Sequence, residues 1–183
     1  MADKFAPGSQ VATAVFYGDV SDVIESIPII FNGQAVTQSQ NVGDGRYYGV
    51  ELSSDYSLSK SLLIGGNVTW MRRDITNPSN PAYELTGVPD VKGIAYLTYR
   101  LARGFSITPN IEFASSRWTV NTDGTLYYKT GAFGLVNMQA EYDLDSKTSF
   151  AVTARNIFDE NYKLVDGFPE AGRSFVANVK AKF

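Results

Sequence analysis

The chain ends in Arg173-Ser-Phe-Val-Ala-Asn-Val-Lys-Ala-Lys-Phe183, a stretch in which apolar and polar residues alternate without a break. Such period-two alternation predicts a single β-strand with one apolar and one polar face. The apolar face includes Phe175, Val179 and the terminal Phe183. The last residues of a soluble chain usually fray into water and do not need such a face. A transmembrane β-barrel presents an apolar face to lipid on every strand, so the stretch favours a membrane strand with these three residues as its insertion signal.

The same alternation returns along the rest of the chain and indicates about eight strands. We therefore expect an all-β protein, an antiparallel transmembrane β-barrel of about eight strands. The clearest stretches are residues 48–58, 105–116, 136–144 and 174–183, and weaker versions run through residues 11–20, 62–70, 91–101 and 149–155.

Short and long connections follow one another between these stretches. Short turns are expected at residues 58–61, 101–104 and 144–148, and long loops at about residues 26–40, 72–90, 117–128 and 157–172. Outer-membrane barrels have short periplasmic turns and longer extracellular loops. An even number of strands then places both ends of the chain on the periplasmic side.

Composition excludes several classes of function. The 183 residues contain no cysteine and no histidine, so thiol chemistry, an imidazole base and the commonest zinc ligand are missing. We expect no enzyme, no catalytic residue, no metal site and no cofactor. The 16 basic and 19 acidic residues give a net charge of -3, which does not favour a nucleic-acid partner. No apolar run approaches the roughly 20 residues of a membrane-spanning helix.

Alternation alone does not say which face of the strands is inside. In a soluble, lipocalin-like barrel the apolar face would line a cavity for a small apolar ligand, and this remains the alternative fold and function. Aromatic residues near the ends of the apolar faces favour a membrane belt, although strands are rich in tyrosine and tryptophan anyway. The aromatic residues in question are Tyr48, Tyr56, Trp70, Tyr99 and Tyr142.

Several motifs carry a resemblance to a known family. They are Asn41-Val-Gly-Asp-Gly-Arg-Tyr-Tyr-Gly-Val-Glu-Leu52, Leu85-Thr-Gly-Val-Pro-Asp90, Arg117-Trp-Thr-Val-Asn-Thr-Asp-Gly124 and, most specifically, Ala154-Arg-Asn-Ile-Phe-Asp-Glu-Asn-Tyr162 followed by Gly167-Phe-Pro-Glu-Ala-Gly-Arg173. From about residue 11 to its end, the chain resembles the C-terminal barrel part of TonB-dependent outer-membrane receptors. In that family a barrel of 22 strands encloses a plug and imports ferric siderophores, cobalamin or similar nutrients.

The resemblance implies a location and partners. It implies the outer membrane of a Gram-negative bacterium, contact with outer-membrane lipid, and recognition of the C-terminal strand by the barrel-assembly machinery. Residues 1–183 are then one barrel domain or part of one, and we expect no plug domain, no TonB box and no signal peptide in them. The strands either close as a small barrel, which the length of the chain favours, or pair with further receptor strands or a second copy.

Two groups of residues are candidates for function. The expected long loops contain a basic and aromatic mix suited to an anionic iron chelate, although ordinary loop-tip residues without a ligand are the more common explanation of such a mix. The charged residues of the polar strand faces are expected to line the lumen of the barrel. The loop candidates are Arg72, Arg73, Trp118, Tyr127, Tyr128 and Lys129, and the lumen candidates are Glu51, Asp55, Lys92, Arg100, Glu112, Glu141, Arg155 and Lys180.

Overall fold

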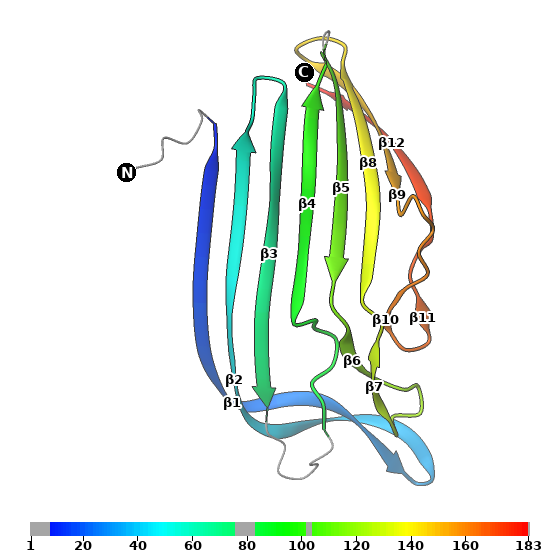
Figure 1. Cartoon of the computed structure of the whole chain (residues 1–183). Helices are drawn as coiled ribbons and strands as arrows, with labels where there is room; N and C mark the ends of the chain where they lie inside the picture. Colours follow the sequence, from blue (N-terminus) through cyan, green and yellow to red (C-terminus); the bar gives the residue numbers. More distant parts are fainter. Residues whose placement is uncertain (1–7, 76–82, 102–103, 183) are drawn as a thin grey trace.

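The computed structural model describes residues 8–75, 83–101 and 104–182, and within them the chain forms one large antiparallel sheet and two small hairpins (Figure 1). The sheet confirms the expected number of eight strands. Across the sheet these are β1 (Gln10–Phe31), β2 (Gln34–Ser57), β3 (Leu62–Ile75), β4 (Val91–Arg100), β5 (Phe105–Ala114), β8 (Phe133–Asp143), β9 (Thr148–Arg155) and β12 (Ser174–Ala181).

The two small hairpins lie at one end of the sheet. One is β6 (Arg117–Val120) with β7 (Tyr127–Thr130), inserted between β5 and β8, and the other is β10 (Lys163–Val165) with β11 (Phe168–Pro169), inserted between β9 and β12. The opposite end has the short turns at residues 58–61 and 144–147, and β4 ends and β5 begins there too, while residues 102–103 of the third expected turn lie outside the described residues. The start of β1 and the end of β12 also lie at the short-turn end, as expected for an even number of strands (Figure 1).

The sheet is open. Among the described residues β1 pairs with β2 and β12 pairs with β9, and no pairing joins β1 to β12. The closed eight-stranded barrel, which the length of the chain favoured, is therefore not what these residues form. Figure 1 shows a single curved layer instead, which has the form expected for one sector of a larger barrel wall.

The register assigns every strand residue to one of two faces, because residues directly opposite each other in a ladder point to the same side. Glu51 lies opposite Thr69, which lies opposite Lys92, and this row defines the polar face. The neighbouring row of Val50 and Trp70 belongs to the apolar face. All eight lumen candidates fall on the polar face, whereas Phe175 and Val179 fall on the apolar face and Phe183 lies outside the described residues.

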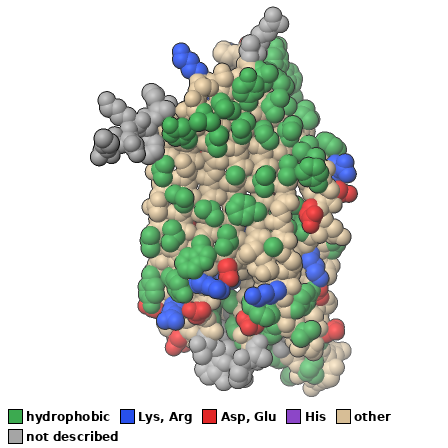
Figure 2. Space-filling model, in the orientation of Figure 1, with side chains coloured by type: hydrophobic (Ala, Val, Ile, Leu, Met, Phe, Trp, Pro, Cys, Tyr) green, Lys and Arg blue, Asp and Glu red, His purple; other side chains and the backbone are tan. Residues whose placement is uncertain are grey.

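The apolar face is exposed rather than packed. Only Ala114 and Leu135 are buried hydrophobic residues in the described part of the chain. The chain exposes 12591 Å², whereas a soluble monomer of its mass, 20.1 kDa, exposes about 8,700 Å². Figure 2 shows hydrophobic side chains across the upper and middle part of the visible face and charged side chains gathered near the loop end. Exposed large side chains of the apolar face include Val11, Val15, Tyr17, Val50, Leu52, Tyr56, Ile64, Trp70, Tyr99, Ile111, Met138, Tyr142, Phe150, Val152, Phe175 and Val179.

The prediction of a long loop at about residues 26–40 is wrong. Residues 26–40 are not a loop but the outer half of the β1–β2 hairpin, which closes in a two-residue turn at Asn32 and Gly33. Both residues have positive φ, 50° and 77°, as a tight hairpin turn requires. A bulge near Asp22, at φ 53°, interrupts the register between Val20 and Val23. Beyond it the hairpin bends away and runs across the loop end (Figure 1).

No helix long and apolar enough to cross a membrane occurs within residues 8–75, 83–101 and 104–182.

Candidate functional site

A cavity of about 300 Å³ lies at the loop end, beside the outer part of β3. Strand β4 begins at Val91, opposite Trp70, so the edge of β3 beyond Trp70 has no strand next to it on that side. The segment 83–90 takes this place, since the Met71 amide donates to the Asp90 carbonyl at 2.9 Å and the Gly87 amide donates to the Trp118 carbonyl at 2.9 Å. The cavity is therefore enclosed by β3, this segment and the β6–β7 hairpin.

Four of the six loop candidates meet in this cavity. Arg72, Arg73, Trp118 and Lys129 all line it, although they come from three separate parts of the chain. The Lys129 ammonium lies 5.1 Å from the centre of the Trp118 ring, a cation–π contact that holds both side chains at the wall. The sequence therefore named four residues that line this cavity, without showing that they are neighbours.

The charges of the cavity favour an anion. Its lining contains four cationic side chains and the three carboxylates of Asp74, Glu84 and Asp90. Two of these carboxylates are already paired: Asp74 with Arg46 at 3.3 Å and Asp90 with Arg72 at 2.9 Å. Arg46 lies outside the lining, so the cations of the lining outnumber its carboxylates, and one of those carboxylates is already paired with a cation from outside.

Arg117 is a residue that the sequence analysis did not select. It begins β6, is 8% exposed and lines both this cavity and a second one of about 520 Å³ on its other side. Its guanidinium lies 5.6 Å from the centre of the Phe133 ring, and its buried Nε atom has no hydrogen-bond partner in the described structure. A buried donor without a partner is costly, so an acceptor that enters the cavity gains from this group.

Burial and nearby charged groups shift the pKa of Arg117 in opposite directions. Burial lowers the pKa of the guanidinium, and Glu170 and then Tyr162 raise it. Burial also raises the pKa of the Tyr162 phenol, with further increases from Glu170 and Glu112. Because an unperturbed arginine titrates far above neutral pH, Arg117 remains a cation at the wall of the cavity.

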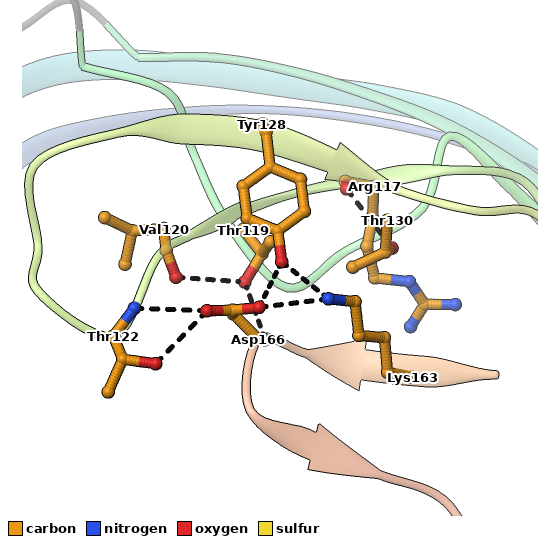
Figure 3. A network of polar contacts seen from close by, with 8 residues as sticks. All are labelled: Arg117, Thr119, Val120, Thr122, Tyr128, Thr130, Lys163 and Asp166. Atoms are coloured by element: carbon orange, nitrogen blue, oxygen red, sulfur yellow. Dashed lines mark hydrogen bonds and ion pairs between the residues drawn. The ribbon is translucent and has the colours of Figure 1, made fainter.

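The other two loop candidates lie elsewhere. The Tyr127 ring packs edge-on against the Tyr83 ring, with 6.0 Å between the ring centres. The Tyr128 hydroxyl donates to the Asp166 carboxylate and accepts from the Lys163 ammonium at 2.8 Å (Figure 3). Tyr128 therefore has a structural contact between two loop hairpins rather than a place at the wall of the cavity.

Asp166 is the centre of this contact (Figure 3). Its carboxylate also accepts from the Thr122 amide at 3.2 Å, the Thr122 hydroxyl at 3.1 Å and Lys163 at 3.0 Å, and its amide donates to the Thr119 hydroxyl at 3.2 Å. The hydrogen bond from Tyr128, followed by that from Lys163, holds the pKa of Asp166 far below its usual range. The β10–β11 hairpin is thereby fastened to the β6–β7 hairpin, which carries Trp118 and Lys129.

The motif around Asn156 forms a second hydrogen-bond network that holds a loop in place, at the end of β9. Asn156 is 3% exposed and has a positive φ of 49°. Its side chain donates to the Glu160 carbonyl at 2.9 Å and accepts from the Glu160 amide at 2.8 Å, while its own amide donates to Asn137 at 2.8 Å. Asp159, at φ 59°, accepts from the Arg173 amide at 2.7 Å. The two ends of the loop between β9 and β12 are therefore held together.

The comparison of the sequence with known protein families identifies one family. The family model described as "TonB dependent receptor-like, beta-barrel" matches residues 4–157. No curated relative matches the sequence at a significant level.

Solved structures of similar fold share little sequence with the chain. They include the copper transporter OprC, with a TM-score of 0.78, 20% identity and 97% of this chain covered, and the siderophore receptor PiuA from Acinetobacter baumannii, with 0.68, 16% and 96%. The FrpB iron transporter from Neisseria meningitidis gives 0.73, 17% and 97%. The chain spans 30%, 26% and 28% of the length of these three proteins.

Proposed function

Because this chain belongs to the TonB-dependent receptor-like β-barrel family, we propose that it forms part of the barrel wall of an outer-membrane receptor that takes up an anionic ferric chelate of the siderophore type. The family consists of receptors and transporters of the Gram-negative outer membrane rather than enzymes. The observation that carries the choice of ligand is the cavity at the end of β3, where Arg73, Arg117, Lys129 and Trp118 meet.

The exposed apolar face supports the membrane location. Aromatic side chains lie on this face near both ends of the spanning strands, for example Tyr48 and Tyr56 on β2. These two residues are eight positions apart, or roughly 26 Å along the strand. At a strand tilt of about 40° this spans roughly 20 Å of the membrane, slightly less than the apolar band of about 25 Å in outer-membrane barrels. The family and this face together favour the membrane barrel over the soluble barrel with an apolar cavity.

The open edges of the sheet at β1 and β12 indicate further binding partners for the chain. We infer that β1 and β12 pair with further strands of the same receptor, with a second copy as the alternative, because an unpaired edge in lipid costs several kcal/mol per backbone group. The charged residues of the polar face then line the lumen. The barrel-assembly machinery is the partner proposed for the C-terminal strand, and the plug domain and TonB box would belong to parts of the receptor outside these 183 residues.

The cavity fits an anionic chelate better than a bare metal ion. Arginine and lysine side chains bind anionic oxygens, and the Trp118 ring offers a flat apolar surface to a planar ligand group. The copper transporter of similar fold suggests copper as the alternative substrate. Soft copper ligands are scarce in this chain, which has three methionines and no cysteine or histidine.

Chelate charge provides a direct test. We expect the chain, refolded in detergent micelles, to bind an anionic ferric tris-catecholate in preference to a neutral ferric tris-hydroxamate. The reason is that the lining has four cationic side chains against three carboxylates, one of which is paired with Arg46 outside the lining. Binding is measured by quenching of the emission of Trp118, in a Trp70→Phe background that removes the second of the two tryptophans.

Two substitutions locate the binding. Lys129→Gln and Arg117→Gln should each weaken binding of the tris-catecholate by roughly tenfold, which is the loss of one charge-assisted hydrogen bond. Arg100→Gln, on the polar face at the other end of the sheet, is the matched control and should leave binding unchanged. Equal affinity for the two chelates, or equal effects of all three substitutions, would contradict the proposal.

A further inference from the structure

The β6–β7 hairpin has two faces that contact different parts of the molecule. Residues opposite each other in a ladder point to the same side, and Trp118 pairs with Lys129 whereas Thr119 pairs with Tyr128. Trp118 and Lys129 line the cavity at the end of β3, called the chelate cavity from here on. Because neighbouring rows alternate, Thr119 and Tyr128 belong to the other face of the same hairpin.

The face with Thr119 and Tyr128 is held by the turn of the β10–β11 hairpin, which contains Asp166 (Figure 3). The Asp166 carboxylate accepts hydrogen bonds from the Tyr128 hydroxyl and from the amide and hydroxyl of Thr122. Its amide donates to the Thr119 hydroxyl at 3.2 Å. Lys163 donates to Tyr128 at 2.8 Å and to Asp166 at 3.0 Å. These five residues form the Asp166 cluster.

The Asp166 cluster joins one hairpin directly to the other. Thr122 lies in the turn between β6 and β7, and Asp166 lies in the turn between β10 and β11. The Asp166 side chain is only 21% exposed, whereas that of Lys163 is 42% exposed. Partial burial strengthens hydrogen bonds to a carboxylate, because less water competes for it.

The β6–β7 hairpin needs such support. Its strands have four residues each, and a two-stranded hairpin by itself is at best marginally stable in water. The pair of Arg117 and Thr130 at its base is buried, but the rows beyond this pair depend on neighbours on both faces. The cluster supplies the neighbour on the face that points away from Trp118 and Lys129.

We propose that Asp166 is a positioning residue of the chelate cavity: it holds the β6–β7 hairpin so that Trp118 and Lys129 stand at the cavity wall before a ligand arrives. This inference rests on the proposed function. Asp166 does not line the cavity, so its effect passes through the hairpin. If the hairpin is in place in only a fraction of the molecules, the apparent affinity falls by that fraction.

Asp166→Asn tests this role in the Trp70→Phe background. Asparagine keeps the size of the side chain but accepts hydrogen bonds at only one of its two terminal atoms, so donors at the other atom lose their acceptor. We expect the ferric tris-catecholate to bind roughly fivefold more weakly. Loss of a negative charge alone would instead favour an anionic chelate, so the direction separates positioning from a simple charge effect.

Two further variants accompany Asp166→Asn. Tyr128→Phe removes one hydroxyl of the cluster and keeps the ring and the net charge, and we expect binding to weaken roughly twofold to threefold. Asp123→Asn is the matched control, because it removes the same charge from the turn of the same hairpin but lies outside the cluster. This variant should not weaken binding.

Hydrogen exchange provides a measurement that a merely structural role would not move. Coupling between two sites is reciprocal, so chelate binding should stabilise the cluster by the factor that Asp166→Asn loses. In the parent chain we expect saturating tris-catecholate to slow exchange of the Thr122 and Asp166 amides roughly fivefold, since both donate within the cluster. The Leu144 amide, which donates to Thr148 at the other end of the sheet, should not respond.

The outcomes separate this inference from the proposed function. If the parent chain binds the chelate and Asp166→Asn binds it equally well or better, only the positioning role is overturned. The same holds if the chelate leaves exchange of the Thr122 and Asp166 amides unchanged, or if Asp123→Asn weakens binding as much as Asp166→Asn. If Asp166→Asn fails to fold, Tyr128→Phe decides the question. No binding by the parent chain would overturn the proposed function and this inference with it.

Discussion

Asn156→Ala is expected to lower the free energy of unfolding by about 3 kcal/mol or more. The substitution removes two hydrogen bonds between the buried Asn156 side chain and the Glu160 backbone, each of which contributes about 0.5–1.5 kcal/mol. It also places a side chain with a β-carbon and no local hydrogen bond at φ 49°, which costs about 1–2 kcal/mol. Urea unfolding of the chain in detergent micelles measures the change.

Asn156→Gly separates the two contributions. Glycine tolerates the positive φ, so this variant should lose only the side-chain hydrogen bonds and be more stable than Asn156→Ala by about 1 kcal/mol. Asn178→Ala, at an exposed asparagine of β12, is the control and should change stability little. If Asn156→Ala is as mild as Asn178→Ala, the turn does not hold the loop after β9 in the way described here.

Met138→Arg is the second substitution with a large expected effect. Met138 lies near the middle of β8 on the apolar face, opposite Pro109 and Ala154, and is 42% exposed. An arginine that faces lipid near the bilayer midplane costs about 2–4 kcal/mol. We therefore expect much less of the Met138→Arg chain to insert into lipid vesicles, as measured by flotation with the vesicles.

The adjacent residue gives the matched control. Gln139 lies on the polar face, opposite Thr108 and Thr153, so Gln139→Arg places the same charge on the same strand but away from lipid. This variant should insert like the parent chain. Similar losses for both variants, or a larger loss for Gln139→Arg, would mean that the apolar face of β8 is not the face in contact with lipid.

The local sequence predicted the strands and their faces well. Alternation in residues 174–183 and 136–144 predicts the apolar or polar side for each residue, and the register agrees over residues 174–181 and 136–143. This worked because the side-chain period of a strand is fixed at two, whatever its neighbours are. The number of strands and the short turns followed for the same reason.

The extent of the first hairpin was missed although a local signal was present. Asn32-Gly33 is a preferred pair for a two-residue hairpin turn, and apolar residues flank it in Ile30 and Phe31. Residues 26–40 lack strict alternation, so they were interpreted as a loop. Similarly, β6 and β7 are only four residues each, too short for a periodic signal, and they lie at the two ends of the expected loop 117–128.

The members of the cavity depend on long-range contacts that the sequence does not reveal. Arg73 and Trp118 meet only because the segment 83–90 bridges β3 and β6. Arg117 is adjacent to Trp118 in sequence but, unlike Trp118, its side chain is buried. Its guanidinium packs against the Phe133 ring, which the sequence does not show. Tyr128 was interpreted as a ligand residue because nothing near it in the sequence shows the approach of Asp166.

The central claim is that the sheet stands in a membrane with its apolar face toward lipid and its polar face toward an aqueous lumen. The chain has no cysteine, so single cysteines can be placed at each position from 134 to 142 on β8 without a background substitution. After insertion into lipid vesicles, each variant is treated with a membrane-impermeant maleimide. We expect fast labelling at the odd, polar-face positions and slow labelling at the even, apolar-face positions, which include 136, 138 and 140. Uniform labelling, or fast labelling at the even positions, would contradict the account.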